Sequence, residues 1–268
     1  MARKREIGKK RKLRRFILSL ILLAVIVTVG TRVLDGIKAR QDRTLGYEDA
    51  VKEITAFAEK KGCDIDDYPS ELISLYARNK DARQFVLDYP LHKDDIFEIN
   101  LKKDVKGDGV PLFMQWDERW GYTKYGNGII GLSACGPVAL SMVAVYLTGD
   151  LSLDPKTVSE FSEKNGYYSW NNGTKWTLMS EGAEKLGLTA KELPLDKNIV
   201  ARELNAGRPI ICIMGAGDFT SSGHYIVLTG YSDGKVSVND PNSYENSEKL
   251  WEFDAIADQI RNLWSYTV

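Results

Sequence analysis

Cys135 is the first residue of CGPVALSMVAVYL, a segment that could place its thiol for nucleophilic chemistry. Gly136 and Pro137 follow it and precede an apolar run. Because proline is tolerated only in the first turn of a helix, this helix begins at or just before Pro137 and holds the cysteine at its N-terminus. The helix dipole and the unpaired N–H groups there lower the pKa of a thiol and favour the thiolate, which is the nucleophilic form. A buried packing role is equally compatible with the position.

The chain has two other cysteines, and neither is placed in this way. Cys212 lies inside PIICIM, a run typical of a strand, so we expect a core thiol. Cys63 follows Gly62 at the end of a predicted helix and is expected to be a packing or surface thiol. Three cysteines leave at least one thiol free and are too few for a disulfide framework.

A cysteine nucleophile needs a base, and histidine is the usual one because its pKa lies near neutrality. Of the two histidines, His92 falls in YPLHKDD, where we expect a solvated loop. His224 opens the apolar run HYIVLTGY directly after the flexible SSG, so its ring could face a cleft from the edge of a sheet. A structural role for His224 is the alternative.

Asp240, in SVNDP, is the candidate partner of His224. A hairpin at SDGK would pair residues 224–232 with residues 235–240 as antiparallel strands, which brings the start of the first beside the end of the second. An aspartate in that place can fix the tautomer and the tilt of the imidazole ring. By itself, an aspartate before Pro241 is more often a turn residue.

The elements that must position these residues come in the order helices first, sheet second. Apolar periodicity predicts a small helical prefix, with helices over residues 47–61, 70–79 and 81–89. Further helices are predicted over 135–147, 177–187 and 198–207, and strands over 209–214, 224–232 and 235–240. This order indicates an α+β fold with an antiparallel sheet rather than a βαβ alternation.

The N-terminus indicates a membrane anchor. Residues 1–15 hold nine Lys or Arg and one Glu, a charge of +8, whereas the whole chain carries −1. Residues 16–34 follow as an apolar run in which only Arg32 is charged, slightly short of the ~20 residues that span a bilayer. We predict an uncleaved, single-pass signal anchor in the cell membrane, with the basic tail cytoplasmic and the C-terminal domain extracellular. A cleaved signal peptide is the main alternative, and a nucleic-acid partner for the basic stretch is a minor one.

The predicted organisation is a basic cytoplasmic tail (residues 1–15), a transmembrane signal anchor (16–34), a stalk and helical prefix (35–109) and a main domain (110–268). The turn-rich LKKDVKGDG marks the last boundary. A hydrophobic content of 43% is ordinary for a globular core and excludes a mainly disordered chain. The sequence contains no Rossmann or Walker A pattern, so we expect no cofactor, and we assign no metal site.

Three motifs, CGPVALSMV, GHYIVLTGY and VNDPNS, with MQWDERWG upstream, resemble the C39-like peptidase domain of the papain-like cysteine peptidase superfamily. The likeness runs from about Val110 to the C-terminus and covers neither the apolar segment nor the helical prefix. It implies a papain-like fold, in which the N-terminal helix of the domain packs on an antiparallel sheet. By this resemblance Cys135 is the nucleophile, His224 the general base and later the acid, and Asp240 the residue that orients the imidazole.

Gln115, in MQW, corresponds most naturally to the glutamine of the family's oxyanion hole, where its amide would act beside the backbone N–H of Cys135. Its distance of 20 residues from Cys135 requires the intervening chain to loop back. The resemblance also points to Trp176, in NNGTKW, and to Gly223 as substrate-binding residues. A core role for Trp176 is the alternative.

These expectations amount to a membrane-anchored extracellular cysteine peptidase that hydrolyses peptide bonds through an acyl-enzyme. Its partners would be a peptide or protein substrate at the cell surface and the membrane, with no nucleic acid. An acyl-transfer enzyme of the transglutaminase type acting on the cell wall is one alternative. A non-catalytic module that binds peptide in the same cleft is another.

Overall fold

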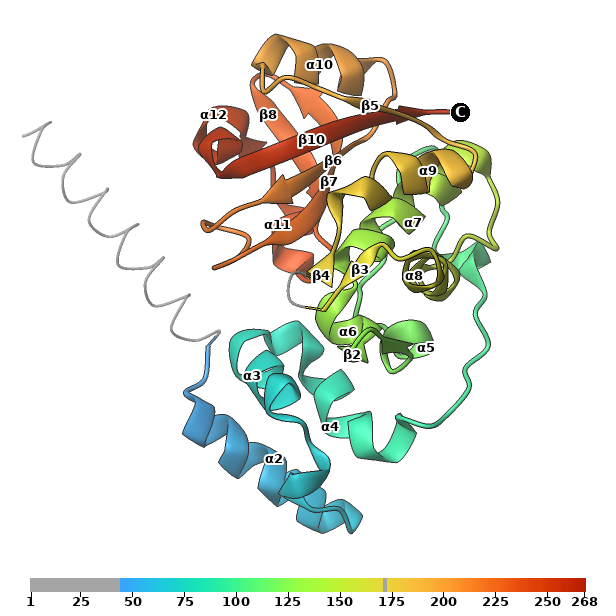
Figure 1. The fold of residues 1–268 in the computed structure, drawn as a ribbon. Helices are drawn as coiled ribbons and strands as arrows, with labels where there is room; N and C mark the ends of the chain where they lie inside the picture. Colours follow the sequence, from blue (N-terminus) through green and yellow to red (C-terminus); the bar gives the residue numbers. More distant parts are fainter. Residues whose placement is uncertain (1–43, 171–172) are drawn as a thin grey trace, which may run out of the picture.

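The structure is a computed structural model that describes residues 44–170 and 173–268. The predicted basic tail (1–15), the signal anchor (16–34) and the stalk up to residue 43 lie outside the described residues. In the two described ranges, no helix is both long enough and apolar enough to cross a membrane. Figure 1 shows a helical end in blue and cyan and a sheet in orange and red, with the central helix α7 (Cys135–Thr148) between them.

The predicted helical prefix is present as α2 (Tyr47–Lys61), α3 (Ser70–Arg78) and α4 (Arg83–His92). α2 ends where the sequence predicts, at Gly62, which adopts the left-handed conformation with φ of 75°. α4 differs from the prediction because it continues through Pro90 to His92. Pro90 lies in the last turn, and the N–H of Lys93 still donates to the carbonyl of Tyr89 at 2.8 Å, so the turn is kept.

The main sheet is antiparallel throughout, which confirms the mixed helix-and-sheet class. Strands β6, β7 and β8 match the predicted ones, whereas β5, β9 and β10 were not predicted. The strand order is β5 (Thr189–Glu192), β10 (Ile260–Thr267), β6 (Ile210–Met214), β7 (His224–Ser232), β8 (Lys235–Asn239), β9 (Trp251–Glu252).

The sheet carries an apolar layer on each face, because successive side chains of a strand point to opposite sides. Ile211 and Ile213 of β6 pack in the cluster formed with α7. Ile210, Cys212 and Met214 pack in the cluster on the other face, with α10 (Lys197–Asn205). Cys212 is therefore a core thiol on the opposite face from α7, as predicted, and burial raises its pKa well above the usual range.

Shorter elements connect these layers. The predicted helix over 177–187 is a 3-10 turn, Trp176–Leu178, followed by α9 (Glu181–Lys185). The remaining helices are α5 (Glu118–Gly121), α6 (Ile130–Ser133), α8 (Pro155–Lys164), α11 (Tyr244–Glu248) and α12 (Phe253–Ile256). Two small hairpins pair β1 (Lys124–Tyr125) with β2 (Gly128–Ile129) and β3 (Tyr168–Ser169) with β4 (Gly173–Thr174).

The helical prefix is packed into the body of the protein through Phe85 of α4. The ring of Phe85 stacks on Tyr122 at a centroid distance of 4.3 Å, and the Tyr122 hydroxyl donates to the Phe85 carbonyl at 2.9 Å. A Cβ on Gly121 or on Gly131 would lie 2.6 Å from this ring, so both glycines are needed for the approach. The prefix and the chain that follows it therefore share one apolar core.

Candidate active site

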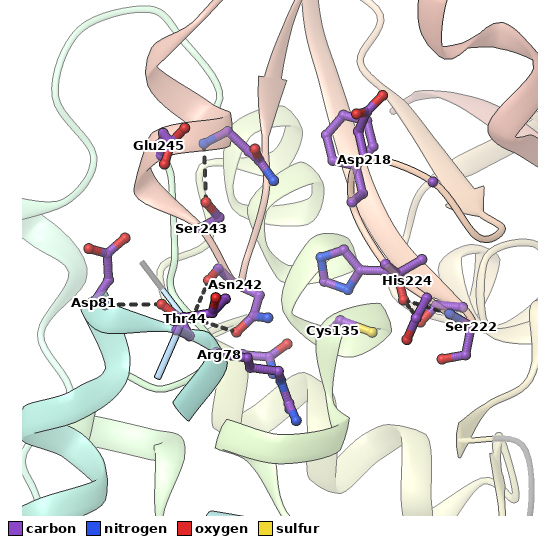
Figure 2. A pocket seen from close by; sticks show the side chains of 18 of the residues that line it. Thr44, Arg78, Asp81, Cys135, Asp218, Ser222, His224, Asn242, Ser243 and Glu245 are labelled. Atoms are coloured by element: carbon purple, nitrogen blue, oxygen red, sulfur yellow. Dashed lines mark hydrogen bonds between the residues drawn. The ribbon is translucent and has the colours of Figure 1, made fainter. Parts of the chain in front are cut away.

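A cavity of about 790 Å³ lies where the start of α7, two loops of the sheet and the helical prefix meet (Figure 2). Cys135, His224, Gln115 and Gly223 all line it, so four of the predicted site residues share one cavity. Residues 217–223 of the loop before β7 form one wall together with His224, and the chain after β8 forms another with Asn242, Ser243, Glu245 and Asn246. Residues 78–81 of the prefix complete it.

Cys135 is the first residue of α7, as the position of Pro137 predicts. Its thiol is partly buried, and the backbone N–H groups of Gly136 and Tyr225 lower its pKa. Gly136 allows the helix to start here, because a Cβ on it would lie 2.8 Å from Cγ2 of Thr174. Burial raises the pKa of the Cys135 thiol, but the hydrogen bond and charge of His224 outweigh that effect, and the net pKa lies below that of a free thiol.

His224 is the first residue of β7 and is 7% exposed. Its Nε2 lies 2.7 Å from Oδ1 of Asp240, which leaves the other ring nitrogen available for Cys135. Burial lowers the pKa of the imidazole, but the charge and hydrogen bond of Asp240, together with Cys135, raise it to about 10. Both shifts favour a protonated ring beside a thiolate.

Asp240 follows β8 and is 1% exposed. The hairpin that carries it turns at Asp233 and Gly234, both with positive φ. Its strands pair Val227 with Asn239, which places Asp240 beside the first residues of β7, as predicted. A buried carboxylate must be hydrogen-bonded, and this one is. Oδ1 also accepts the N–H of Asn242 at 2.8 Å, and Oδ2 accepts Nδ2 of Asn246 at 2.8 Å.

Gln115 is 4% exposed and is held from two sides. Its Nε2 donates to the carbonyl of Gly131 at 2.9 Å, and its backbone N–H donates to the carbonyl of Pro241 at 2.7 Å. The chain between Gln115 and Cys135 thus loops back, as the assignment requires. The bond to Gly131 orients the side-chain amide so that Nε2 of Gln115 faces the Gly131 carbonyl. The second N–H of Nε2 takes no part in this bond. Oε1 is buried without a hydrogen-bond partner among the described residues.

Trp176 stands apart from this group. It is 47% exposed, packs edge-to-face on Trp264 at a centroid distance of 6.0 Å, and does not line the cavity of Cys135. The turn Trp176–Leu178 directs the side chain toward Trp264 of β10, and its role in substrate binding stays a prediction. His92 lies at the end of α4 rather than in a loop, with Nδ1 2.7 Å from Oδ2 of Asp95. Cys63 is a free, partly buried thiol.

Two features of the site were missed by sequence reasoning. Asn246 donates a hydrogen bond to Asp240, and its signal was the run NSYENS that follows Pro241. The prefix contributes a wall of the cavity, although nothing in its sequence pattern indicates chemistry. In the described part of the chain, no cluster of three or more His, Cys, Asp or Glu is arranged to hold a metal ion.

Some solved structures of known proteins are similar to this chain. One similar solved structure is a protein from Bacillus anthracis described as a C39-like peptidase, with 17% identity and a TM-score of 0.41 over 60% of this chain and 96% of that one. Another is the peptidase domain of Streptococcus ComA, a bifunctional ABC transporter involved in a quorum-sensing pathway, with 20% identity and a TM-score of 0.40 over 50% of this chain and 91% of that one. Curated proteins gave no match.

The Peptidase_C39 like family matches the sequence over residues 108–268. This range holds Gln115, Cys135, His224 and Asp240 and begins two residues before the predicted boundary at Val110. It excludes the helical prefix. Because the match covers more than half of the sequence, the chain belongs to the Peptidase_C39 like family.

Proposed function

We propose that this protein is a cysteine peptidase that hydrolyses peptide bonds through Cys135, His224 and Asp240, with Gln115 in the oxyanion hole. The observation that carries the proposal is that Cys135 at the start of α7, His224 and Asp240 lie next to one another. Cys135 and His224 line the same cavity, the His224 ring lowers the pKa of the Cys135 thiol, and Nε2 of that ring lies 2.7 Å from a buried carboxylate. A structural cysteine has no need of such a chain of charges, whereas a thiolate nucleophile is stabilised by it.

The proposed reaction uses each group in turn. The Cys135 thiolate attacks the carbonyl carbon of the scissile peptide bond, and the carbonyl oxygen becomes an oxyanion. The backbone N–H of Cys135, which has no acceptor inside its own helix, and the Gln115 amide donate to that oxygen. His224 then gives its proton to the leaving amine, which departs and leaves a thioester.

The second half of the reaction restores the enzyme. His224, now neutral, takes a proton from water, and the resulting hydroxide attacks the thioester carbonyl. Collapse of the tetrahedral intermediate releases the acid product and regenerates the thiolate beside the imidazolium. Asp240 holds the ring in the orientation that both proton transfers need.

The proposal includes location. The basic stretch (1–15) and the apolar run (16–34) would anchor the chain in the cell membrane with residues 35–268 outside, where the substrates would be peptides or proteins at the cell surface. The family match supports a peptidase, and the sequence of the first 34 residues alone supports the anchor.

Replacement of the nucleophile tests the proposal. We expect Cys135→Ser and Cys135→Ala to lower turnover of cleaved peptides by roughly 10⁴-fold or more while the thermal midpoint of unfolding stays close to that of the parent. Cleavage products would be identified by mass spectrometry after incubation with a peptide library. Cys212→Ala is the matched control, which should lower stability and leave the rate nearly unchanged. Normal activity of Cys135→Ala would end the proposal.

The same assay separates the alternatives. Products that join two peptides, rather than products that carry a new carboxyl end, would indicate an acyl-transfer enzyme. Binding of peptides without any product, and without rapid alkylation of Cys135, would indicate a non-catalytic module.

A further inference from the structure

The helical prefix forms a fixed wall of the cavity next to Cys135. The last turn of α3 and the turn after it bring Arg78, Asn79, Lys80 and Asp81 to the lining. Nδ2 of Asn79 donates to the carbonyl of Asn242 at 2.7 Å and lies 3.2 Å from Oδ1 of the same residue. The loop that follows Asp240 thus holds the end of α3 directly, and Arg78 comes just before this link.

Arg78 is a cation of this wall without a counter-charge in the described part of the chain. Among the described residues, none forms an ion pair or hydrogen bond with its guanidinium, although the side chain remains accessible from the cavity. The surrounding protein partly desolvates it, and this burial lowers the pKa of the guanidinium. Figure 2 shows Arg78 and Cys135 on neighbouring walls of the cavity.

Two other charged groups of the lining have partners among the described residues. Nζ of Lys249 lies 3.9 Å from the ring centroid of Trp251, and the carboxylate of Asp218 accepts Nε2 of Gln259 at 2.7 Å. A guanidinium in the last turn of a helix also complements the helix dipole, but that role is fulfilled equally well by a side chain in bulk water. The accessible and partly desolvated site of Arg78 therefore needs another explanation.

Arg78 also joins two cavities. A second cavity of about 580 Å³ lies between α3, the end of α4 and the hairpin β1–β2. Arg78 and Leu132 line both this cavity and the one that holds Cys135. A peptide extended from the nucleophile toward the prefix would therefore pass the guanidinium.

We propose that Arg78 is a specificity residue that binds a carboxylate of the substrate peptide on the prefix side of Cys135. The inference rests on the proposed peptidase function and goes beyond it, because Arg78 lies outside the range that the family covers. The planar guanidinium offers two parallel N–H donors that match the two oxygens of a carboxylate. The carboxylate belongs either to an Asp or Glu side chain or to the C-terminus of the peptide, and the experiment below separates the two.

Matched peptides test the preference. In the full-length protein, kcat/KM would be measured for library peptides that carry Glu or Gln at each position near the cleaved bond, and for each peptide with a free or an amidated C-terminus. We expect the parent to favour one carboxylate by roughly tenfold or more, the size of a charge-assisted contact. Arg78→Met should remove this preference, and Arg78→Lys should keep part of it. A loss confined to Glu/Gln pairs assigns the side chain, and a loss confined to free/amidated pairs assigns the terminus.

A second measurement does not depend on finding a good substrate. The rate constants for alkylation of Cys135 by iodoacetate, an anion, and by iodoacetamide, its neutral analogue, would be compared. Their ratio reports the positive charge near the thiol and is independent of how reactive the thiol is. Arg78→Met should lower the ratio several-fold, whereas Arg202→Met, which removes the same charge from the exposed side of α10, should leave it unchanged.

The outcomes separate the two proposals. Slow alkylation of Cys135 by both reagents, at the rate of a free thiol, ends the peptidase proposal, and the ratio still reports on Arg78. A ratio and a substrate preference that are the same in Arg78→Met as in the parent end the inference about Arg78. An equal loss in Lys80→Met also overturns it, because the summed charge of the cavity would then set the preference.

Discussion

The balance at Cys135 and His224 depends on one buried carboxylate. Burial alone would favour a neutral thiol beside a neutral imidazole, because charged groups are poorly solvated in a protein interior. The charge of Asp240 opposes this and raises the pKa of His224, and the protonated ring in turn lowers the pKa of Cys135. Asn242 and Asn246 hold the carboxylate in place through their N–H groups.

The pH dependence of the rate tests this balance. Activity should rise as Cys135 ionises, below the range of a free thiol, and should fall near pH 10 as His224 loses its proton. Asp240→Ala removes the main cause that raises the histidine pKa, so the alkaline limb should move to lower pH and the maximal rate should fall. Asp240→Asn keeps a hydrogen-bond acceptor without the charge. Its alkaline limb should therefore lie between those of the parent and Asp240→Ala, and its loss of rate should be smaller than that of Asp240→Ala. kcat/KM measured from pH 5 to about 11 checks the order.

A control and a contrary result complete this experiment. Gln115→Ala should slow acylation without moving either limb, because an amide does not titrate. If Asp240→Ala kept the alkaline limb of the parent, Asp240 would not be the partner that charges the imidazole.

At the scale of elements, local signals predicted the parts of the site that lie close in sequence. Pro137 fixed the start of α7, and the SDGK turn fixed the β7–β8 hairpin, so Cys135 and the pair of His224 with Asp240 could be located from the sequence. Strand β10 was missed because IRNLWSYT lacks regular alternation and pairs with β5 and β6, which are remote in sequence. The contact of Trp176 with Trp264 was not predicted because the packing of one tryptophan on another has no sequence pattern.

The wall made by the prefix could not be predicted for a related reason. Phe85 looks like any apolar helix residue, and its role comes from two glycines, Gly121 and Gly131, that are more than thirty residues away. These glycines leave a space that only a ring from another segment fills. A single sequence gives no means of matching the two.

Phe85 also connects the prefix to the site. Its ring packs on Gly131, whose carbonyl holds the amide of Gln115. Phe85→Ala should lower the free energy of unfolding by roughly 3–5 kcal/mol, because it leaves a cavity in the shared core. We also expect kcat of the folded protein to fall by a few-fold to ~100-fold, since small displacements of positioned groups are costly. Urea unfolding and steady-state kinetics measure the two effects.

The half-buried Phe57 of α2 provides the comparison for this variant. Phe57→Ala should cost less stability and leave kcat unchanged, because no contact links it to Gln115. Equal effects of the two substitutions on kcat would mean that the prefix influences the site only through overall stability.

At the scale of the whole molecule, a basic N-terminal stretch is separated from an acidic remainder by an apolar run. The first 15 residues carry +8, so the rest of the chain carries −9, and the apolar run separates the two parts. If this run anchors the protein with its C-terminal part outside, protease added to intact cells should release fragments that begin after about Arg40 and should spare the basic tail. Immunoblots against each end would measure this. If the main domain were protected until the cells are lysed, the predicted topology, with the C-terminal part outside, would be wrong.

The last prediction concerns how much of the chain is needed for a folded enzyme. The family covers residues 108–268, but Met114, Trp116 and Tyr122 of that range are buried in a core that they share with the prefix. A chain shortened to residues 108–268 would expose this apolar surface and lose the ring of Phe85, so it should unfold at a much lower temperature than residues 44–268 and bind a hydrophobic dye. Any cleavage that it retains should lack the carboxylate preference, because Arg78 is gone. Thermal unfolding and peptide kinetics on the two chains decide the matter. Equal unfolding midpoints and equal carboxylate preferences of the two chains would show that the prefix is dispensable. A lower midpoint together with a lost preference in the shorter chain would show that the prefix is part of the enzyme. The reason is that the helices that complete the core also complete the cavity.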